Sequence, residues 1–494
     1  MNRKARLFGA AAVFLLLAAL VVVALRPSPA QDSSEPLFST RTTIRLWYQD
    51  DSLTDFFSDA AAAYNQSHRQ ARVVPTLVTD TDYVQKLYDA SVEGDEFPDV
   101  FVAENGDLGR LYKAGLAAEV TGTQYFANTN TFPQSAIDAV TCNDLVVAYP
   151  LCFETSAFLY NTDYLQSMAD SLGQSLTDTV PKTMLDVIRL ANGYDAPEGV
   201  SAVMKWDVSD IFYNYCFVGA YLDVGGPDGD DPDSLELYNS QLIQCLQVYQ
   251  QMNQYFAIDS KTDDYDSVLQ SFEDGSLVFM LATTGAVQDI RDKIADGSST
   301  IHYGVAAIPD STDSLQTKTM SVTDCLVVNG YSEHQDLAED FIQYVLDSQM
   351  DSFYDTTGMP AAKSGITYSD EHMDGFVQAY ADSVPVTKLR EASNFWMLLE
   401  ETFQDVWDGT DCNDALHDLA QKVMIQISGT ENYKVDKIAD PEPIDITADL
   451  SYDADSDGGD TTASTESSTE AATESATEAA TEATTEDAAA VDTK

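Results

Sequence analysis

The chain has 494 residues, and its 82 acidic side chains against 25 basic ones give a formal net charge of −57. A surface of one sign repels nucleic acid and anionic lipid, which excludes partners of those classes and favours a soluble monomer. About 410 residues lie between the two compositionally biased ends, enough for two domains.

Residues 1–30 have the pattern of an export segment. A basic start precedes a mostly apolar run over residues 7–25, and the small residues Ser28 and Ala30 follow. The pattern predicts either a signal peptide cut after Ala30 or an uncleaved membrane anchor, because the run is just long enough to span a bilayer. No cysteine follows the run, so no lipid anchor is expected. Both alternatives place the bulk of the chain outside the cytoplasm, secreted or at the cell surface.

Strands and helices alternate directly after the export segment. The pattern predicts strands over residues 43–48, 72–78 and 99–103, with a helix after each of the first two. The first helix has apolar residues at the spacing of one buried face: Leu53, Phe56, Phe57, Ala60, Ala61 and Tyr64. Such alternation builds a parallel sheet, whose ligands bind outside the carboxyl ends of the strands. The loops after the first and third strands are therefore expected to face a binding site.

Two sets of residues follow those strand ends. Trp47, Tyr48 and Asp50 lie at the end of the first strand, and Glu104 and Asn105 follow the third. Aromatic faces and fixed polar groups are what a small-molecule site needs, so we expect all five to contact a ligand.

The six cysteines leave two alternatives open. An even count in an exported chain permits disulfides, and Cys142 and Cys152, which flank a strand over residues 145–150, are the best candidate pair. The apolar surroundings of most of the six fit buried free thiols equally well. The sequence has no CxxC motif and no clustered histidines, so we expect neither a metal nor a cofactor.

Residues 453–494 form a low-complexity acidic segment. Glutamates recur every four residues from Glu466 to Glu486 among Thr, Ser and Ala. Like charges four apart repel on a helix and little is apolar, so we expect a disordered spacer. Residues 453–458 imitate the start of a calcium loop, but Ser464 stands where such a loop needs glutamate, so no calcium site is expected.

A series of segments resembles, in order, the extracellular sugar-binding proteins of the maltose-binding type. The most specific is residues 149–163, YPLCFETSAFLYNTD, which resembles the segment that crosses between the two lobes of that family. The other matching segments are residues 44–47, 94–100, 111–116, 181–183, 272–280, 303–309, 338–341 and 357–360. The resemblance covers roughly residues 42–430 of the chain.

The resemblance implies an α/β, two-lobed periplasmic-binding-protein-like fold with a hinge between the lobes. Residues 42–153 with 278–325 are expected to form one lobe, and residues 154–277 with 326–445 the other. The implied function is to capture a small solute, a sugar or oligosaccharide, and to deliver it to the permease of an ABC importer. Closure of the lobes over the solute requires no catalytic residue, so no enzyme activity is expected.

The resemblance also assigns further ligand-binding residues. Glu154 matches a sugar-contacting acid at the crossover, and Trp206 and Trp396 lie where the family has aromatic residues facing the cleft. Where sugar binders of the family often have an aromatic residue after the returning strand, this chain has Thr283 and Thr284. We expect their hydroxyls or backbone N–H groups to contact the ligand.

The nature of the solute stays open at the level of sequence. The candidate loops contain no arginine, the usual partner of carboxylate and phosphate, so an anionic solute is disfavoured and neutral carbohydrate or a cationic solute remains. A sensory module that presents a solute to a membrane receptor would have the same sequence features. A secreted glycosidase, which needs two carboxylates across a cleft, is a further alternative.

Overall fold

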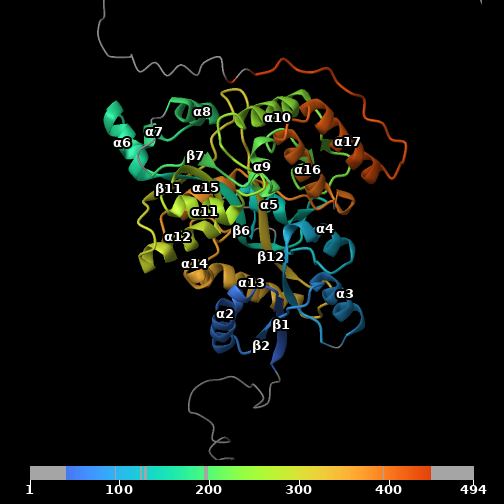
Figure 1. Cartoon of the computed structure of the whole chain (residues 1–494). Helices are drawn as coiled ribbons and strands as arrows, with labels where there is room; N and C mark the ends of the chain where they lie inside the picture. Colours follow the sequence, from blue (N-terminus) through green and yellow to red (C-terminus); the bar gives the residue numbers. More distant parts are fainter. Residues whose placement is uncertain are drawn as a thin grey trace, which may run out of the picture. The chain divides into compact units, whose positions relative to one another are not determined.

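The computed structural model describes residues 41–446 except 95, 123–124, 127–130, 194–198, 393 and 445 (Figure 1). The export segment and the acidic segment with its calcium-like run lie outside these residues. Within them, none of the helices combines the length and apolar character needed to cross a membrane.

The predicted alternation of strands and helices at the start of the chain is confirmed. Strand β1 (Thr42–Tyr48) pairs in parallel with β2 (Ala71–Leu77) on one side and with β3 (Val100–Glu104) on the other. Helix α2 (Thr54–Ser67) buries the predicted apolar face against this sheet, including Phe57 and Tyr64. The period of the helix therefore set which face is buried.

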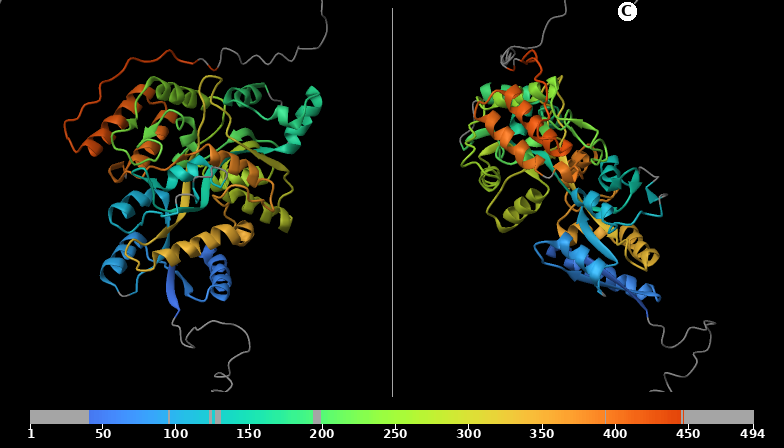
Figure 2. Two further views of the ribbon diagram at one scale, coloured as in Figure 1. Left: turned by 180° about the vertical axis from the view of Figure 1, so that it is seen from behind. Right: turned by 90° about the vertical axis from the view of Figure 1, so that its right-hand side faces the viewer.

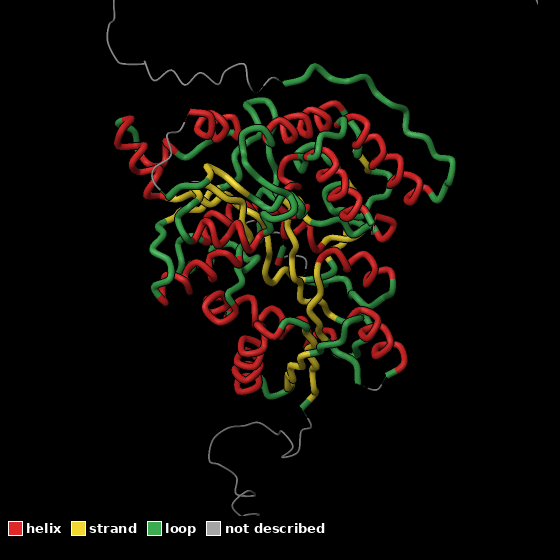
Figure 3. Tube along the Cα trace, in the orientation of Figure 1, coloured by secondary structure: helices red, strands yellow, loops and turns green. Residues whose placement is uncertain are grey.

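The main sheet is mixed rather than parallel throughout, with the order β2-β1-β3-β12-β6-β10-β7. Strand β6 (Tyr149–Asn161) is long enough to belong to two parts of it (Figure 3). Its first half pairs antiparallel with β12 (Met320–Val328), which also pairs antiparallel with β3. Its second half pairs antiparallel with β10 (Leu277–Thr283) and β11 (Tyr303–Ala306). Strand β6 thus connects two halves of the molecule.

The buried apolar side chains form two clusters. The first, core 1, lies around β1, β3 and β12 and includes helices α2, α3 (Tyr83–Glu93), α4 (Asn105–Lys113), α5 (Gln134–Val140), α12 (Gly285–Asp296), α13 (Gln335–Ser348), α14 (Phe353–Thr357) and α15 (Met373–Ala381). The second, core 2, includes β7 (Ala202–Lys205), α6 (Thr162–Leu172), α8 (Met184–Gly193), α9 (Ile211–Asn214), α10 (Ser240–Met252), α16 (Phe395–Trp407) and α17 (Cys412–Ser428). Figures 1 and 2 show α2, β1 and β2 at one end of the described residues and α10, α16 and α17 at the other, with β6 and β12 between them.

Short elements complete the chain order. They are η1 (Asp51–Leu53), β4 (Thr141–Cys142), β5 (Leu145–Val146), α7 (Leu176–Thr179), η3 (Tyr215–Phe217), β8 (Asp223–Val224), β9 (Leu235–Glu236), α11 (Tyr265–Glu273), η4 (Met350–Ser352), β13 (Val384–Pro385) and η5 (Arg390–Ala392).

Strand pairing differs from the expected division into lobes. Residues 278–325 were expected to return to the first lobe, but β10 and β11 both pair with the second half of β6, and β10 also pairs with β7. Residues 326–380, expected in the second lobe, contribute their buried side chains to core 1. The reason is the length of β6: because its second half offers a pairing edge on each side, the chain stays there through β11 and crosses back only at β12.

All six cysteines are buried and free in the structure, so the candidate pair of Cys142 and Cys152 is not formed. Burial raises the pKa of the Cys142 thiol to about 11. The Cys152 thiol donates a hydrogen bond to Asp324 Oδ2 at 3.6 Å. The structure therefore agrees with the second of the two alternatives, buried free thiols, which are unreactive.

An irregular segment, residues 431–444 with Ile446, runs over the surface of core 2 and is called the strap. Backbone groups of the strap bond to side chains of two helices: Val435 N donates to Gln421 Oε1 at 3.0 Å, and Gln251 Nε2 donates to Ile444 O at 3.1 Å. Ile446 is buried among the residues of core 2. These contacts make the strap part of the folded unit.

We predict that truncation on either side of the strap has opposite results. Removal of residues 453–494 should leave the melting temperature unchanged, because that segment has almost no apolar side chain to bury. Removal of residues 431–494 should lower the free energy of unfolding by about 2–4 kcal/mol through lost burial of Ile446 and its neighbours. Thermal unfolding of both truncated chains tests this; a fall of more than about 3 °C in the first would contradict it.

Candidate functional site

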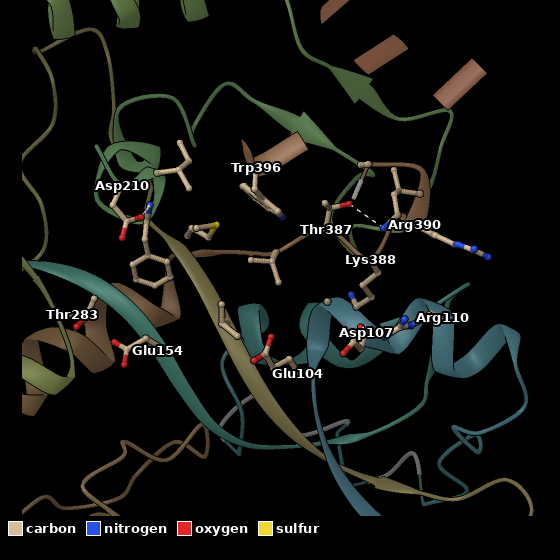
Figure 4. Close-up of a pocket in the computed structure, with 18 of the residues that line it drawn as sticks. Glu104, Asp107, Arg110, Glu154, Asp210, Thr283, Thr387, Lys388, Arg390 and Trp396 are labelled. Carbon is tan, nitrogen blue, oxygen red and sulfur yellow. Dashed lines mark hydrogen bonds and ion pairs between the residues drawn. The ribbon is translucent and has the colours of Figure 1, made fainter. Parts of the chain in front are cut away.

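A cleft of about 900 Å³ lies where the two cores meet (Figure 4). The residues that line it come from both: Glu104, Gly106, Asp107, Arg110, Glu154, Asp210, Ile211, Phe212, Tyr213, Thr283, Met320, Val322, Val386, Thr387, Lys388, Leu389, Arg390, Ala392 and Trp396. Its volume is in the range of sites that hold small molecules.

Ends of strands and helices supply most of these residues. Glu104 is the last residue of β3 and Thr283 the last of β10, so both follow the rule that ligands bind at the carboxyl ends of strands. Figure 4 shows Asp210, Glu154 and Thr283 at one side of the cleft and Arg110 and Arg390 at the other, with Trp396 and Glu104 between them.

The carboxylate of Glu154 is held in a fixed orientation. The backbone N–H of Thr284 donates to Glu154 Oε1 at 2.7 Å, and the Thr284 hydroxyl donates to Oε2 at 2.7 Å. Burial raises the pKa of Glu154, and the bonds from Thr284 oppose that rise. Each carboxylate oxygen keeps acceptor capacity for a group in the cleft.

Two further carboxylates lie opposite each other, one of which, Glu104, lines the cleft. Glu104 of β3 and Asp324 of β12 are register partners on antiparallel strands, at a bulge in the pairing of β12 with β6. Burial, with the nearby charge of Glu104, raises the pKa of Asp324 to about 7. Burial and Asp107 raise the pKa of Glu104. Like charges directly opposite on a sheet are destabilising.

Three aromatic side chains line the cleft. Trp396 is the second residue of α16 and packs against Tyr215, with ring centroids 5.8 Å apart. Phe212 and Tyr213 lie on α9, and Tyr213 stacks on Tyr265 at 5.2 Å. These rings offer apolar faces beside the carboxylates.

Three basic side chains also line the cleft. Arg110 pairs with Asp107 at 2.9 Å, and Arg390 is exposed. Lys388 is only 3 % exposed; its Nζ donates to the backbone oxygen of Asp138 at 2.7 Å and to that of Asp228. The candidate loops contain no arginine, but α4 and the segment before α16 bring two arginines to the cleft, so the argument against an anionic solute does not hold for the whole cleft.

The predicted site residues fall into two groups. Glu104, Glu154, Thr283 and Trp396 line the cleft together. Trp47, Tyr48, Asp50, Asn105, Trp206 and Thr284 do not line it.

The end of β1 does not line the cleft, because β1 is one strand further from it than β3, although the charge of Asp50 is near enough to add to the rise that burial causes in the pKa of Asp324. Tyr48 is buried against Phe57, with ring centroids 5.2 Å apart. Trp47 lies under the Lys86 ammonium group, and Asp50 Oδ1 accepts from Ser52 N at 2.8 Å. These three residues form local structure.

Asn105 is fully buried and supports the cleft from below. Its Oδ1 accepts from Thr323 N at 2.9 Å, and its Nδ2 donates to Val386 O at 3.1 Å. It thus connects α4 to β12 and to the segment that carries Lys388. A buried amide with both groups bonded is a structural residue.

Trp206 lies in core 2 with no exposed surface. Its Nε1 donates to Asn214 Oδ1 at 2.9 Å, and its ring contacts Phe217, Phe256 and Trp407. This full burial favours a role in core packing over the predicted contact with the ligand. The same segment does reach the cleft, but through Asp210, Phe212 and Tyr213.

Sequence reasoning missed the residues that depend on tertiary placement. Residues 210–213 follow Trp206 closely in the sequence. The prediction therefore names the right segment but not the residues of it that line the cleft. Residues 386–392 have no local signal, because they form a connection after the edge strand β13 whose position depends on both cores.

The arrangement defines a class of protein. A mixed α/β chain with two cores, a crossover strand between them and a cleft lined from both is a two-lobed binding protein of the periplasmic type. The chain belongs to the bacterial extracellular solute-binding protein family, whose model matches residues 50–351.

Individual relatives agree with this family. The chain is 22% identical to the maltodextrin-binding protein MdxE of Bacillus subtilis (strain 168) over 349 residues, which cover 66% of this chain and 78% of that protein. Among solved structures, an extracellular solute-binding protein from Staphylococcus aureus in complex with maltose has a TM-score of 0.67 at 16% identity, covering 80% of this chain and 100% of that one. The maltose-binding protein MalE from Listeria monocytogenes has a TM-score of 0.65 at 21% identity, with coverage of 80% and 100%. These structural similarities concern the fold.

Proposed function

We propose that this chain captures an oligosaccharide in the cleft and delivers it to the permease of an ABC importer. The observation that carries the proposal is one cleft that combines an aromatic face, Trp396, with the carboxylates Glu104 and Glu154. Sugar rings require a flat apolar face for their C–H side and fixed acceptors for their hydroxyls. The maltodextrin- and maltose-binding relatives support the same class of solute.

Capture is proposed to work by closure of the two lobes. On the pairing of the two halves of β6, residues 41–153 with 320–386 are assigned to the first lobe and residues 154–319 with 387–446 to the second, although the buried side chains of α12 pack into core 1. A solute that contacts both lobes stabilises the closed state by its higher affinity for that state. The permease then recognises the closed protein.

The solute leaves the cleft chemically unchanged in this proposal. Incubation of the protein with oligosaccharides should therefore release no shorter products, whereas a glycosidase would release them. Residues 1–30 are proposed to export the chain, either as a cleaved signal peptide or as an anchor.

A melting-temperature screen of the full chain with mono- and oligosaccharides, maltose and maltotriose included, tests the proposal. A ligand that binds only the folded state raises the melting temperature in proportion to the logarithm of its concentration. Uronates and amino sugars belong in the screen, because Arg110 and Arg390 line the cleft together with carboxylates. If no saccharide raises the melting temperature, the proposal fails.

We predict that Trp396→Ala weakens binding of the saccharide found in this screen about tenfold, because the ring provides stacking area worth about 1–1.5 kcal/mol. Trp47→Ala is the matched control: it removes the same kind of ring outside the cleft and should leave affinity unchanged. Fluorescence or calorimetric titration measures both. Equal affinity of the two variants would show that the solute does not stack on Trp396.

A further inference from the structure

Thr284 is almost fully buried, 4 % exposed, and lies directly before helix α12. A threonine at this position normally accepts a hydrogen bond from the first turn of its own helix. Here the side chain makes no such bond. Its hydroxyl instead donates to the Glu154 carboxylate, which belongs to a strand 130 residues earlier.

From this geometry we propose that Thr284 is a positioning residue: its backbone N–H and its hydroxyl hold the two oxygens of Glu154 in the orientation that accepts hydrogen bonds from the solute. The inference rests on the proposed function, in which Glu154 contacts the solute. It replaces the expectation that Thr284 itself contacts the ligand.

The contacts of the carboxylate explain why such positioning matters. Glu154 is half-buried at the side of the cleft, and the loss of water there favours the neutral form of a carboxylate unless donors stabilise the charge. Among the described residues, the groups whose pKa responds to the charge of Glu154 are Tyr213 of α9, Tyr265 of α11 and Asp324 of β12, and none of these three is a cation. The two bonds of 2.7 Å from Thr284 fix the orientation of the carboxylate, and together with a backbone bond from Thr155 they oppose the rise in the pKa of Glu154 that burial causes.

The hydroxyl can be removed without changing the shape of the residue. Thr284→Val keeps the volume and the backbone N–H but lacks the hydroxyl donor, and Thr284→Ser keeps the donor. The pKa of Glu154 is measured by NMR titration of full-length protein with ¹³C-labelled glutamate carboxyl groups. The Glu154 signal is the one that is missing from the spectrum of Glu154→Gln. We expect Thr284→Val to raise the pKa of Glu154 by about one pH unit and Thr284→Ser to leave it near the wild-type value.

Titration with maltotetraose provides the second readout. Thr284→Val should weaken binding about tenfold and shift the acidic limb of its pH profile upward, while Thr284→Ser should weaken it less than about threefold. In a Glu154→Gln background the same Val substitution should have no further effect. An unchanged Glu154 titration in Thr284→Val, or an equal loss of affinity with and without Glu154, overturns the positioning role. If the wild-type protein binds no saccharide, the proposed function fails, and the carboxyl titration alone decides the role of Thr284.

Discussion

Trp206→Ala is expected to destabilise the protein by about 3–5 kcal/mol, the usual cost of emptying a large aromatic site in a core. The ring has no exposed surface and packs among aromatic residues of core 2, and its N–H is bonded to Asn214. The substitution leaves a cavity and also removes the donor to a buried amide. Denaturant unfolding measures the change in the free energy of unfolding.

Trp396→Ala is the control for this prediction, since Trp396 is partly exposed at the cleft and should contribute less to stability. The two tryptophans should therefore separate stability from binding. A Trp206→Ala protein of normal stability that no longer binds saccharide would place Trp206 at the ligand, against the structure.

Asp324→Asn is expected to stabilise the protein by about 2 kcal/mol at pH 8 and by less than half of that, about 0.8 kcal/mol, at pH 5. The pKa of Asp324 rises from 3.8 to about 7 on folding, because the carboxyl is buried opposite Glu104. Between these two values the folded state holds a proton that the unfolded state has released, so stability falls as pH rises through about 7. The full rise in the pKa of Asp324 would correspond to a change of about 4 kcal/mol in the free energy of unfolding. We expect about half of this change, because Asp324 is partly exposed to solvent.

Urea unfolding of the wild type and Asp324→Asn from pH 5 to pH 8 measures this difference. Asp59→Asn, an exposed carboxylate on α2, serves as the control and should show no gain that depends on pH. A gain in Asp324→Asn that is the same at both pH values would mean that the charge of Asp324 is not what destabilises the strand pair.

Local patterns predicted what depends on local physics. The apolar spacing of residues 53–64 gave the buried face of α2, and the alternation of strands and helices gave the parallel pairing of β1, β2 and β3. The strand-end rule found Glu104, because β3 borders β12 at the cleft. The same rule failed at Tyr48, because β1 is one strand further away.

Tertiary placement decided the rest. Trp206 and Tyr213 lie on one short segment and are both buried, and only the packing of core 2 determines that Tyr213 also reaches the cleft. Arg390 enters the site from a connection that follows β13, and nothing in its local sequence indicates the cleft. The boundary between the lobes depends on which half of β6 the strands β10, β11 and β12 pair with. The local sequence of these strands does not predict that pairing.

Calorimetric titration of the wild type and of Glu154→Ala, with the saccharide that gives the largest rise in melting temperature, tests the central claim most directly. The account predicts one site per chain in the wild type. Affinity should be ten- to hundredfold lower in Glu154→Ala, the usual loss for a hydrogen bond to a charged acceptor. Equal affinity in the two proteins, or no saturable heat in the wild type, would contradict the claim that this cleft holds a carbohydrate.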